Sequence, residues 1–253
     1  MKLDIQKAAL LKRISAWIFD AILLVVVATG VALALSVAVD FDSHTNRLSA
    51  VYEQYEQQYG IDFDITPEEL SKLTEEELQR YEEASTALST DNDAITAYNM
   101  VLNLMLVILT GSILLSFIGL EILVPLRLQN GQTLGKKIFG VALMRRNGVK
   151  INAISLTIRT ILGKFTIETM IPVLLFLMMI LGLIGVVAPV MLLVLLVAQL
   201  LSLVLSRRGA ALHDLLADTV AVDLESQMIF DSEEELVEYA KKLAAEKASR
   251  SPY

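Results

Sequence analysis

The sequence predicts an all-α integral membrane protein: a bundle of four transmembrane helices, with an amphipathic helix at the membrane interface and a small helical extracytoplasmic insertion. Three observations predict this class. Hydrophobic residues make up 55% of the chain and are massed in long blocks, without the period of an amphipathic helix or strand. Residues 40–93 contain 15 Asp/Glu and 3 Lys/Arg, a net charge of −12 in a chain of net −8. Basic residues flank the other apolar blocks, as in cytoplasmic loops.

The first apolar block follows a short basic segment. Residues 14–39 are apolar except for Asp20 and a few small polar residues, and about 20 residues are enough to cross the hydrocarbon core. The alternative is a secretory signal peptide, because the start is basic and Ala32-Leu33-Ala34 resembles a cleavage site. The block is long for a signal peptide and contains Asp20. We expect residues 1–39 to be a cytoplasmic N-terminus and the first transmembrane helix.

Residues 40–97 are polar and rich in helix-forming residues. Thr66 with Glu69, and Thr74 with Glu77, have the spacing of capping boxes. Three tyrosines share one helical stripe, which is typical of a packing surface: Tyr52, Tyr55 and Tyr59. We expect an acidic helical insertion on the outer side, with a protein partner as one use for it.

The second transmembrane helix is expected at residues 98–126, with Pro125 at its end. Residues 127–150 contain six Lys/Arg and no acid, which indicates a cytoplasmic loop. Within this loop Asn147-Gly148 favours a hairpin that joins residues 141–144 to 149–151. Residues 151–168 have one apolar face and three charged residues, so we expect an interfacial helix to complete the 127–169 segment.

Residues 170–205 contain no charge, and as one helix they would be about 54 Å long. Gly182, Gly185 and Pro189 interrupt their middle, so a transmembrane helical hairpin is expected over residues 170–206. Arg207 and Arg208 then begin a cytoplasmic tail, 207–253, whose helix starts at the capping pair Ser232 and Glu235. The predicted protein is a multi-pass protein of the cell (plasma or inner) membrane with both termini in the cytoplasm.

Ionisable residues within these apolar blocks are candidates for function. Asp20 costs several kcal/mol in hydrocarbon unless it is paired, hydrated or protonated. Arg13 lies seven residues earlier on the same helix face, about 10.5 Å along the axis, too far for a direct ion pair. Two interpretations remain open: a static network that fixes helix register, or an ion or proton pathway. The candidate network is Arg13, Asp20, Glu121, Arg159, His213 and Asp214, and Lys136 and Lys137 are expected to contact lipid headgroups.

The motifs of several other function classes are missing from the sequence. There is no cysteine, which excludes disulfides and thiolate metal sites. We find no catalytic triad, no metal-ligand spacing and no nucleotide fingerprint. The glycine-bearing loop 131–137 lacks the glycine spacing of a P-loop. We expect no enzyme activity, no cofactor, no metal and no nucleic-acid partner.

Four segments, in order, resemble the RDD family of membrane proteins. Arg13-Ile14-Ser15-Ala16-Trp17-Ile18-Phe19-Asp20 is similar to its opening motif, and the loop that starts Gly131-Gln132-Thr133-Leu134-Gly135 is similar to the family's loop. Arg159 matches a downstream arginine, and His213-Asp214-Leu215-Leu216-Ala217-Asp218 is similar to the closing motif. The resemblance places the family's arginine and two aspartates at Arg13, Asp20 and Asp214. Asp218 stands where the pattern has glycine, and the 40–97 insertion is longer than the usual first loop.

The resemblance implies transport of an unidentified ligand, with monovalent cation/proton exchange attributed to some members. We expect transport of a monovalent cation or proton, with Asp20 as the ion-binding residue. Four spans are few for a complete pathway, so a homo-oligomer is expected as well. The alternative is a non-transporting membrane adaptor or assembly factor that acts through its outer insertion and tail. A membrane-embedded enzyme rests only on His213 and Asp214.

Overall fold

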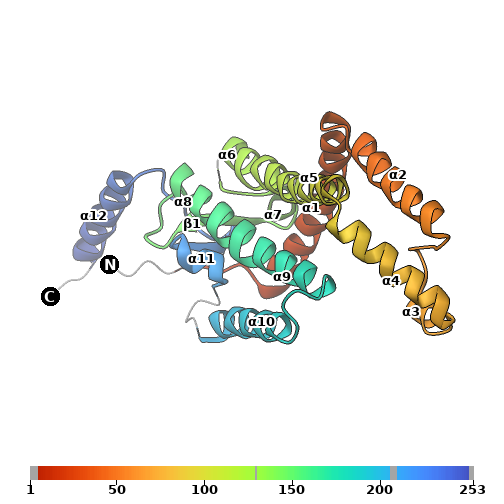
Figure 1. The fold of residues 1–253 in the computed structure, drawn as a ribbon. Coiled ribbons are helices and arrows are strands. Elements are labelled where there is room, and N and C mark those ends of the chain that lie inside the picture. The colour runs from red at the N-terminus through yellow and green to blue at the C-terminus, as the bar shows by residue number, and fades with distance from the viewer. Residues whose placement is uncertain (1–4, 129, 206–209, 251–253) are drawn as a thin grey trace. The chain divides into compact units, whose positions relative to one another are not determined.

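The computed structural model describes residues 5–128, 130–205 and 210–250. Figure 1 shows a mostly helical chain with one small sheet. It divides into two compact units, which are considered separately below. Unit 1 comprises residues 1–28 and 113–253, and unit 2 comprises residues 29–112.

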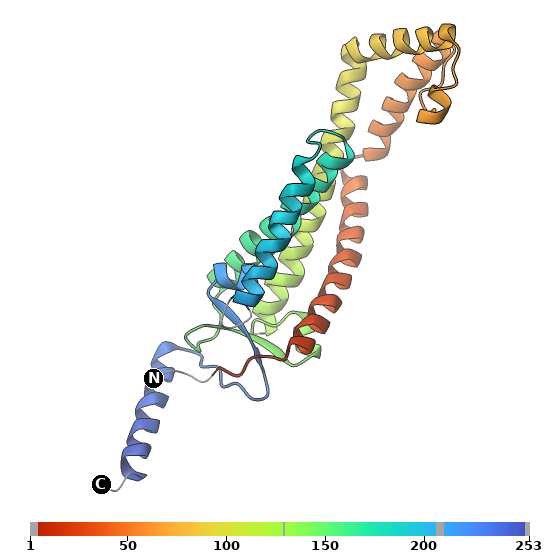
Figure 2. The ribbon, with the colours of Figure 1, turned by 90° about the horizontal axis from the view of Figure 1, so that it is seen from below.

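Within the described ranges, three continuous helices are long and apolar enough to cross a membrane. They are α1 (Leu10–Ala38), the helix Asn92–Leu128 and the helix Ala153–Ile180. The second consists of α5 (Asn92–Phe117), η1 (Ile118–Leu123) and α6 (Val124–Leu128). The third consists of α8 (Ala153–Thr157), η2 (Ile158–Met170) and α9 (Ile171–Ile180). A further helix, α10 (Val187–Leu205), contains the shorter apolar segment Val187–Ser202 and packs beside α9 (Figure 2).

The expected interfacial helix at 151–168 is not a separate element. It continues without a break into α9, so the boundary that we predicted near residue 169 is absent. The prediction relied on the charges of Lys164 and Glu168, which normally require water or headgroups. Both side chains are instead largely buried against partners of opposite charge or against a histidine. The helix does end before Gly182, and Gly182 and Gly185 adopt positive φ angles in the turn that leads to α10.

Both long helices contain a π-helical stretch that ends two residues before a proline. The stretch η1 ends at Leu123 before Pro125, and η2 ends at Met170 before Pro172. Proline has no N–H and its ring crowds the carbonyl four residues earlier, which a wider turn relieves. Pro125 therefore lies inside the second helix and does not end it. Both stretches carry charged residues that are buried within unit 1: Glu121 in η1, and Arg159 and Lys164 in η2.

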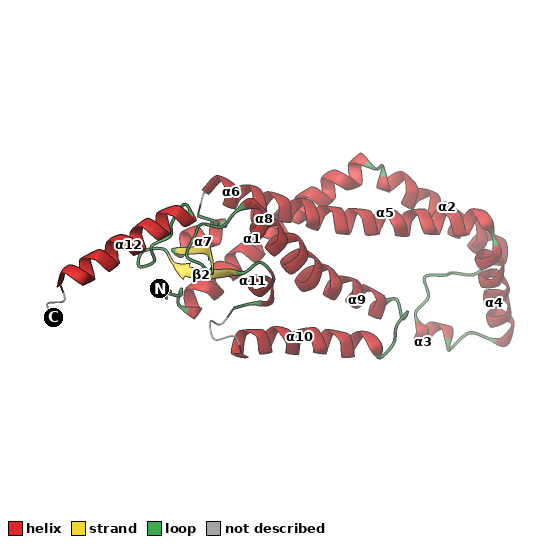
Figure 3. Ribbon diagram, turned by 90° about the vertical axis from the view of Figure 1, so that its left-hand side faces the viewer, coloured by secondary structure: helices red, strands yellow, loops and turns green. Residues whose placement is uncertain are grey.

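The expectation of an all-α protein is wrong in one respect, because the mostly helical chain also forms a small sheet. Strands β1 (Val141–Arg145) and β2 (Thr219–Asp223) form a two-stranded antiparallel sheet, with Val141 opposite Asp223 and Arg145 opposite Thr219 (Figure 3). The predicted hairpin forms in part: Arg145 N–H donates to the Val149 carbonyl, and one isolated antiparallel bridge pairs Met144 with Lys150. The stronger partner for β1 comes from the end of the chain, because β2 supplies a second row of buried apolar side chains.

Three shorter helices complete unit 1: α7 (Leu134–Ile138), α11 (Leu212–Leu216) and α12 (Glu233–Arg250). The isolated bridge between Lys7 and Val222 adds the N-terminal segment to the edge of the sheet. Glu235 N–H donates to Ser232 Oγ, which matches the predicted start of α12. Arg207 and Arg208, which we expected to follow the last span, lie outside the described residues.

Unit 2 includes the end of α1, most of α5, and helices α2 (Phe41–Tyr59), α3 (Pro67–Leu70) and α4 (Glu75–Thr90). Both predicted capping boxes are present, at Thr66 with Glu69 and at Thr74 with Glu77. The tyrosine stripe of α2 packs as predicted: the Tyr52 ring meets Phe63 edge-on, and Phe63 meets Tyr81. The Tyr55 hydroxyl donates to Asp91 at 2.8 Å, joining α2 to the residue that precedes α5.

Candidate functional site: a charged pocket in unit 1

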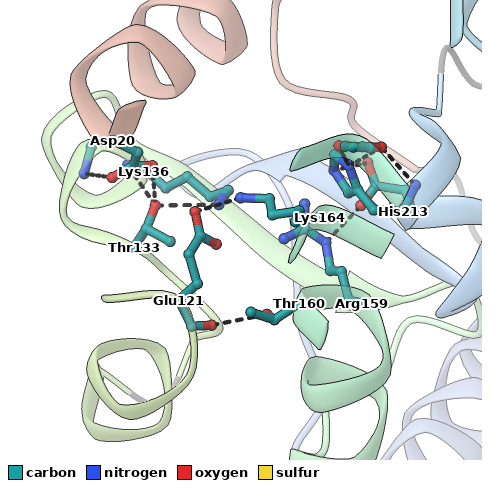
Figure 4. Close-up of polar contacts among 11 residues, drawn as sticks. Asp20, Glu121, Thr133, Lys136, Arg159, Thr160, Lys164 and His213 are labelled. Carbon is teal, nitrogen blue, oxygen red and sulfur yellow. Dashed lines mark hydrogen bonds and ion pairs between the residues drawn. The ribbon is translucent and has the colours of Figure 1, made fainter. Parts of the chain in front are cut away.

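A pocket of about 460 Å³ lies in unit 1, where α1, η1, α7, η2 and α11 approach one another. One wall is apolar and comes mainly from the first turns of α1. The other side carries most of the ionisable groups, whose contacts are drawn in Figure 4. The ionisable residues that line the pocket are Arg13, Asp20, Glu121, Lys136, Arg159, Lys164, Glu168, His213 and Asp214.

Asp20 holds the start of helix α7. One carboxylate oxygen accepts a hydrogen bond from the Thr133 hydroxyl, and the other accepts from the Gly135 N–H at 2.8 Å. Thr133 is also the N-cap residue of α7, so two side-chain groups satisfy the unpaired N–H groups there. A side chain at Gly135 would collide with the Ala16 carbonyl oxygen, so glycine is required for this close approach. The Asp20 carboxylate is therefore stabilised by neutral donors at the start of a helix.

Glu121 pairs with Lys164, and the two come from the two π-helical stretches. The Lys164 ammonium lies 2.5 Å from Glu121 Oε1, and both side chains are about nine-tenths buried. The Thr160 hydroxyl donates to the Glu121 backbone carbonyl at 3.2 Å. Pro125 has no N–H to offer that carbonyl, which explains why it accepts from another helix. Glu121 Oε2 is buried, and among the described residues it has no hydrogen-bond partner.

Arg159 and Asp214 form the most deeply buried ion pair of the pocket. Arg159 Nε donates to Asp214 Oδ1 at 2.9 Å, and each side chain is 3% exposed. The Thr219 hydroxyl donates to the same oxygen at 3.0 Å, which ties the pair to the start of β2. Burial alone would raise the pKa of Asp214, but the Arg159 guanidinium outweighs it and holds that pKa below its usual range. Arg159 Nη1 is buried without an acceptor in the described part of the chain.

The imidazole of His213 pairs with Glu168 across the contact between α11 and η2. His213 Nδ1 lies 2.8 Å from the Glu168 carboxylate, whereas Nε2 is 3.6 Å from Asp214. Burial, followed by the positive charge of Arg159, lowers the pKa of His213, so at pH 7 the neutral ring donates to Glu168. Gly163 allows this contact, since a Cβ there would lie 2.5 Å from His213 Cβ.

Lys136 and Lys137 have opposite environments although they are neighbours. Lys137 is exposed, while Lys136 is 8% exposed and donates to the Thr133 hydroxyl at 3.2 Å. Lys136 and Lys164 point toward one another beside the Glu121 carboxylate (Figure 4). Burial lowers the pKa of Lys136 to about 7, and the charge of Lys164 contributes to the shift. Lys136 therefore loses its proton more readily than an exposed lysine such as Lys137.

The structure brings together every residue of the predicted network, but with different partners. The sequence predicted the network without its pairs, and the pairs present are Glu121 with Lys164 and Arg159 with Asp214. Arg13 lines the same pocket. Sequence analysis missed the functional positions of Thr133, Thr160, Lys164, Glu168 and Thr219. Only Thr133 gave a local signal, since it occupies an N-cap position before a short basic helix.

The part of the chain that contributes Arg13, Asp20 and Asp214 to the pocket also matches a known protein family. The family model for RDD matches residues 7–218. The chain belongs to the RDD family. The RDD match extends from just before α1 to the turn that precedes β2, and so includes every ionisable residue of the pocket. The comparison with curated proteins and the comparison with solved structures each found no match.

One departure of this RDD chain from the family pattern has a physical explanation. Asp218, which stands where the pattern has glycine, has a φ angle of 51°, in the left-handed region that favours glycine. Aspartate is among the residues that tolerate this region, and here it pairs with Arg146 at 3.1 Å. Across the described ranges, no group of three or more His, Asp or Glu residues is placed to hold a metal ion.

Proposed function

We propose that this RDD protein is a multi-pass transporter of the cell membrane that exchanges a monovalent cation for a proton through the unit 1 pocket. The observation that carries the proposal is Glu121. Its carboxylate is buried in the pocket, and Oε2 has no partner among the described residues. An ionisable residue within an apolar helix is expensive, and such residues commonly mark ion or proton pathways.

Lys136 supplies a proton site beside this carboxylate. With a pKa near 7, its ammonium form and its neutral form are both populated at neutral pH. The Lys164 ammonium already pairs with Glu121 Oε1, and protonated Lys136 adds a second positive charge nearby, which disfavours a further cation there. Loss of the proton from Lys136 removes one of these two charges and favours the binding of a cation at Oε2. Competition between one proton and one cation for the same region is the basis of exchange.

Asp20 has a different role in this proposal from the ion-binding role that we expected. Both of its oxygens accept hydrogen bonds from the start of α7, the helix that carries Lys136. We assign Asp20 to the positioning of Lys136 relative to Glu121. Asn at this position offers one acceptor oxygen in place of two, so Asp20→Asn should shift the pH profile of exchange as well as lower its rate.

The test uses purified protein in liposomes with an internal pH-sensitive dye and an imposed proton gradient. Na⁺, K⁺ or Li⁺ is added, and collapse of the gradient is compared for the wild type, Glu121→Gln and the control Lys137→Gln. The proposal predicts cation-dependent collapse in the wild type and the control, and its loss in Glu121→Gln. If Glu121→Gln, confirmed as folded and incorporated, exchanges cations like the wild type, the proposed site is wrong.

The second candidate function is a non-transporting adaptor, and the observation that favours it is unit 2. This unit has its own aromatic contacts, and it contains 15 of the 29 acidic residues of the chain, most of which are exposed. A basic protein partner would fit such an acidic surface. The transport proposal, in contrast, includes a homo-oligomer. Deletion of residues 41–92 separates the two functions. An adaptor would lose its partner in a pull-down, whereas a transporter would retain cation-dependent proton flux.

A further inference from the structure

Two consecutive hydrogen bonds join Lys136 on α7 to Asp20 on α1. Lys136 Nζ donates to the Thr133 hydroxyl oxygen at 3.2 Å, and the Thr133 hydroxyl donates to Asp20 Oδ2 (Figure 4). A hydroxyl group both accepts and donates a hydrogen bond, so it can take a proton from one neighbour and give its own to the other. Thr133 therefore connects an amine to a carboxylate through a group that is able to pass protons.

The amine of Lys136 depends on this connection more than the carboxylate of Asp20 does. Both residues line the unit 1 pocket, but Lys136 is 8% exposed whereas Asp20 is half-buried. An amine gains or loses a proton through a group within hydrogen-bond reach. Within the described ranges, the Thr133 hydroxyl is the one acceptor that Lys136 Nζ reaches.

The transfer can be written as one balanced step. When Asp20 is protonated and Lys136 is neutral, the Asp20 O–H bond breaks as a new O–H bond forms on Thr133. The original Thr133 O–H bond breaks in the same step as an N–H bond forms on Lys136. The products are a carboxylate, an unchanged hydroxyl and an ammonium, and their hydrogen bonds have the direction that the structure shows. A carboxylic acid is ordinarily a far stronger acid than an ammonium, so transfer from Asp20 to Lys136 is favourable.

We propose that Thr133 relays protons between Asp20 and Lys136. The use of Lys136 as the proton site of transport rests on the proposed function, whereas the two hydrogen bonds exist whether or not the protein exchanges cations. The relay adds to the positioning role of Asp20, because Oδ1 accepts from the Gly135 N–H while Oδ2 faces Thr133.

The variants must separate the relay from a structural role of Thr133. Its hydroxyl oxygen also caps α7, accepting from the Lys136 backbone N–H at 3.4 Å. Thr133→Ser keeps both the cap and the hydroxyl. Thr133→Asn keeps the cap, since asparagine is a favoured N-cap residue, and its amide can accept from Lys136 and donate to Asp20. An amide does not pass a proton on, because its N–H is too weak an acid, so only the relay is lost.

The first measurement is the rate at which the Lys136 ammonium exchanges its protons with water. It is followed by NMR on the full-length protein with ¹⁵N-labelled lysine, at pH 6, where the ammonium form prevails because the pKa is about 7. The Lys136 signal is assigned by its absence from Lys136→Gln. We expect exchange to be about 100-fold slower in Thr133→Asn and within about threefold of the wild type in Thr133→Ser, at the low end of what a positioned proton-transfer group contributes.

A double variant tests whether Asp20 and Thr133 act in series. Asp20→Asn removes the carboxylate that takes up the proton, so it should slow exchange at Lys136 by a factor similar to that of Thr133→Asn. Blocking one path twice has no further effect, so the double variant should be no slower than either single variant. Multiplied effects would mean two independent routes and would contradict the relay. The exposed Lys137→Gln is the matched control and should leave exchange at Lys136 unchanged.

The remaining outcomes separate the relay from the proposed function. Wild-type exchange in Thr133→Asn would show that protons reach Lys136 directly from the pocket, and an equal loss in Thr133→Ser would assign Thr133 to packing; either result overturns the relay. In the liposome assay, Thr133→Asn should lower the maximal rate of proton flux without changing the cation concentration at half-maximal rate. Slow exchange at Lys136 in Thr133→Asn, together with a wild type that shows no cation-dependent flux, would retain the relay and overturn cation exchange.

Discussion

The protonation of Lys136 should make the free energy of unfolding depend on pH. Its pKa is about 7 in the folded protein, against an ordinary value of 10.5. Between these pH values the unfolded chain binds a proton that the folded chain does not, so the free energy of unfolding should rise with pH from 7 to about 10. The slope from this one group is at most about 1.4 kcal/mol per pH unit.

Lys136→Met is expected to remove this slope and to be more stable than the wild type at pH 7. The exposed Lys137→Met, as the matched control, should keep the wild-type slope. The measurement is denaturant or thermal unfolding in one detergent across pH 7 to 10. A wild-type slope that persists in Lys136→Met would show that Lys136 has an ordinary pKa.

The positive φ angle of Asp218 leads to a second prediction about stability. A non-glycine residue in the left-handed region costs roughly 1 kcal/mol relative to glycine. The half-exposed pair with Arg146 offsets little of this cost. In an Arg146→Gln background, Asp218→Gly should raise the free energy of unfolding by about 1 kcal/mol, and in the wild-type background by the same amount or less. Destabilisation in the Arg146→Gln background would exclude backbone strain as the reason for glycine in the family pattern.

Each π-helical stretch contains a glycine, and substitution of these glycines tests how closely the stretches pack against their neighbours. A Cβ at Gly163 would lie 2.5 Å from His213 Cβ and 2.8 Å from its Cα, so Gly163→Ala must push α11 away from η2. At Gly119, in the other stretch, an added Cβ would meet nothing within 4 Å. We expect Gly163→Ala to cost about 1–3 kcal/mol of stability, and Gly119→Ala to be neutral or stabilising. Equal effects of the two substitutions, measured by thermal unfolding in one detergent, would show that α11 does not pack closely on η2.

Local signals account for the elements that the sequence predicted correctly. The capping boxes of α3 and α4 and the break at Gly182 are each specified within a few residues. The pairing of β1 with β2 joins Val141 to Asp223, and no local pattern contains that information. The charges of Lys164 and Glu168 led to the expectation of an interfacial helix. A residue type does not show whether its partner is water or a buried side chain, and here the partners are Glu121 and His213.

The same limit applies to the whole pocket. Six of its ionisable residues were predicted as one network, because ionisable residues within or beside long apolar segments are unusual. Their pairing depends on which helices face each other, and the sequence of a single chain does not specify that. Our proposal assigns Asp20 a positioning role in place of the expected ion binding for this reason: its partners Thr133 and Gly135 lie more than 110 positions away.

At the scale of the whole molecule, the end of the chain is expected to divide into a required and a dispensable part. Strand β2 contributes Val220 and Val222, which are buried, and Thr219, which donates to Asp214 in the pocket. Beyond Phe230, the contacts of α12 with the rest of unit 1 include Arg145 with Glu233, an exposed pair of little energy, and the ring of Tyr239 against Phe230. A chain that ends after Asp231 should keep a Tm within a few degrees of the full chain. A chain that ends after Asp218 loses the sheet and the Thr219 hydrogen bond, and it should fail to fold or melt far lower. Thermal melting of the two truncated proteins in one detergent tests this, and equal Tm values would mean that the pocket forms without β2.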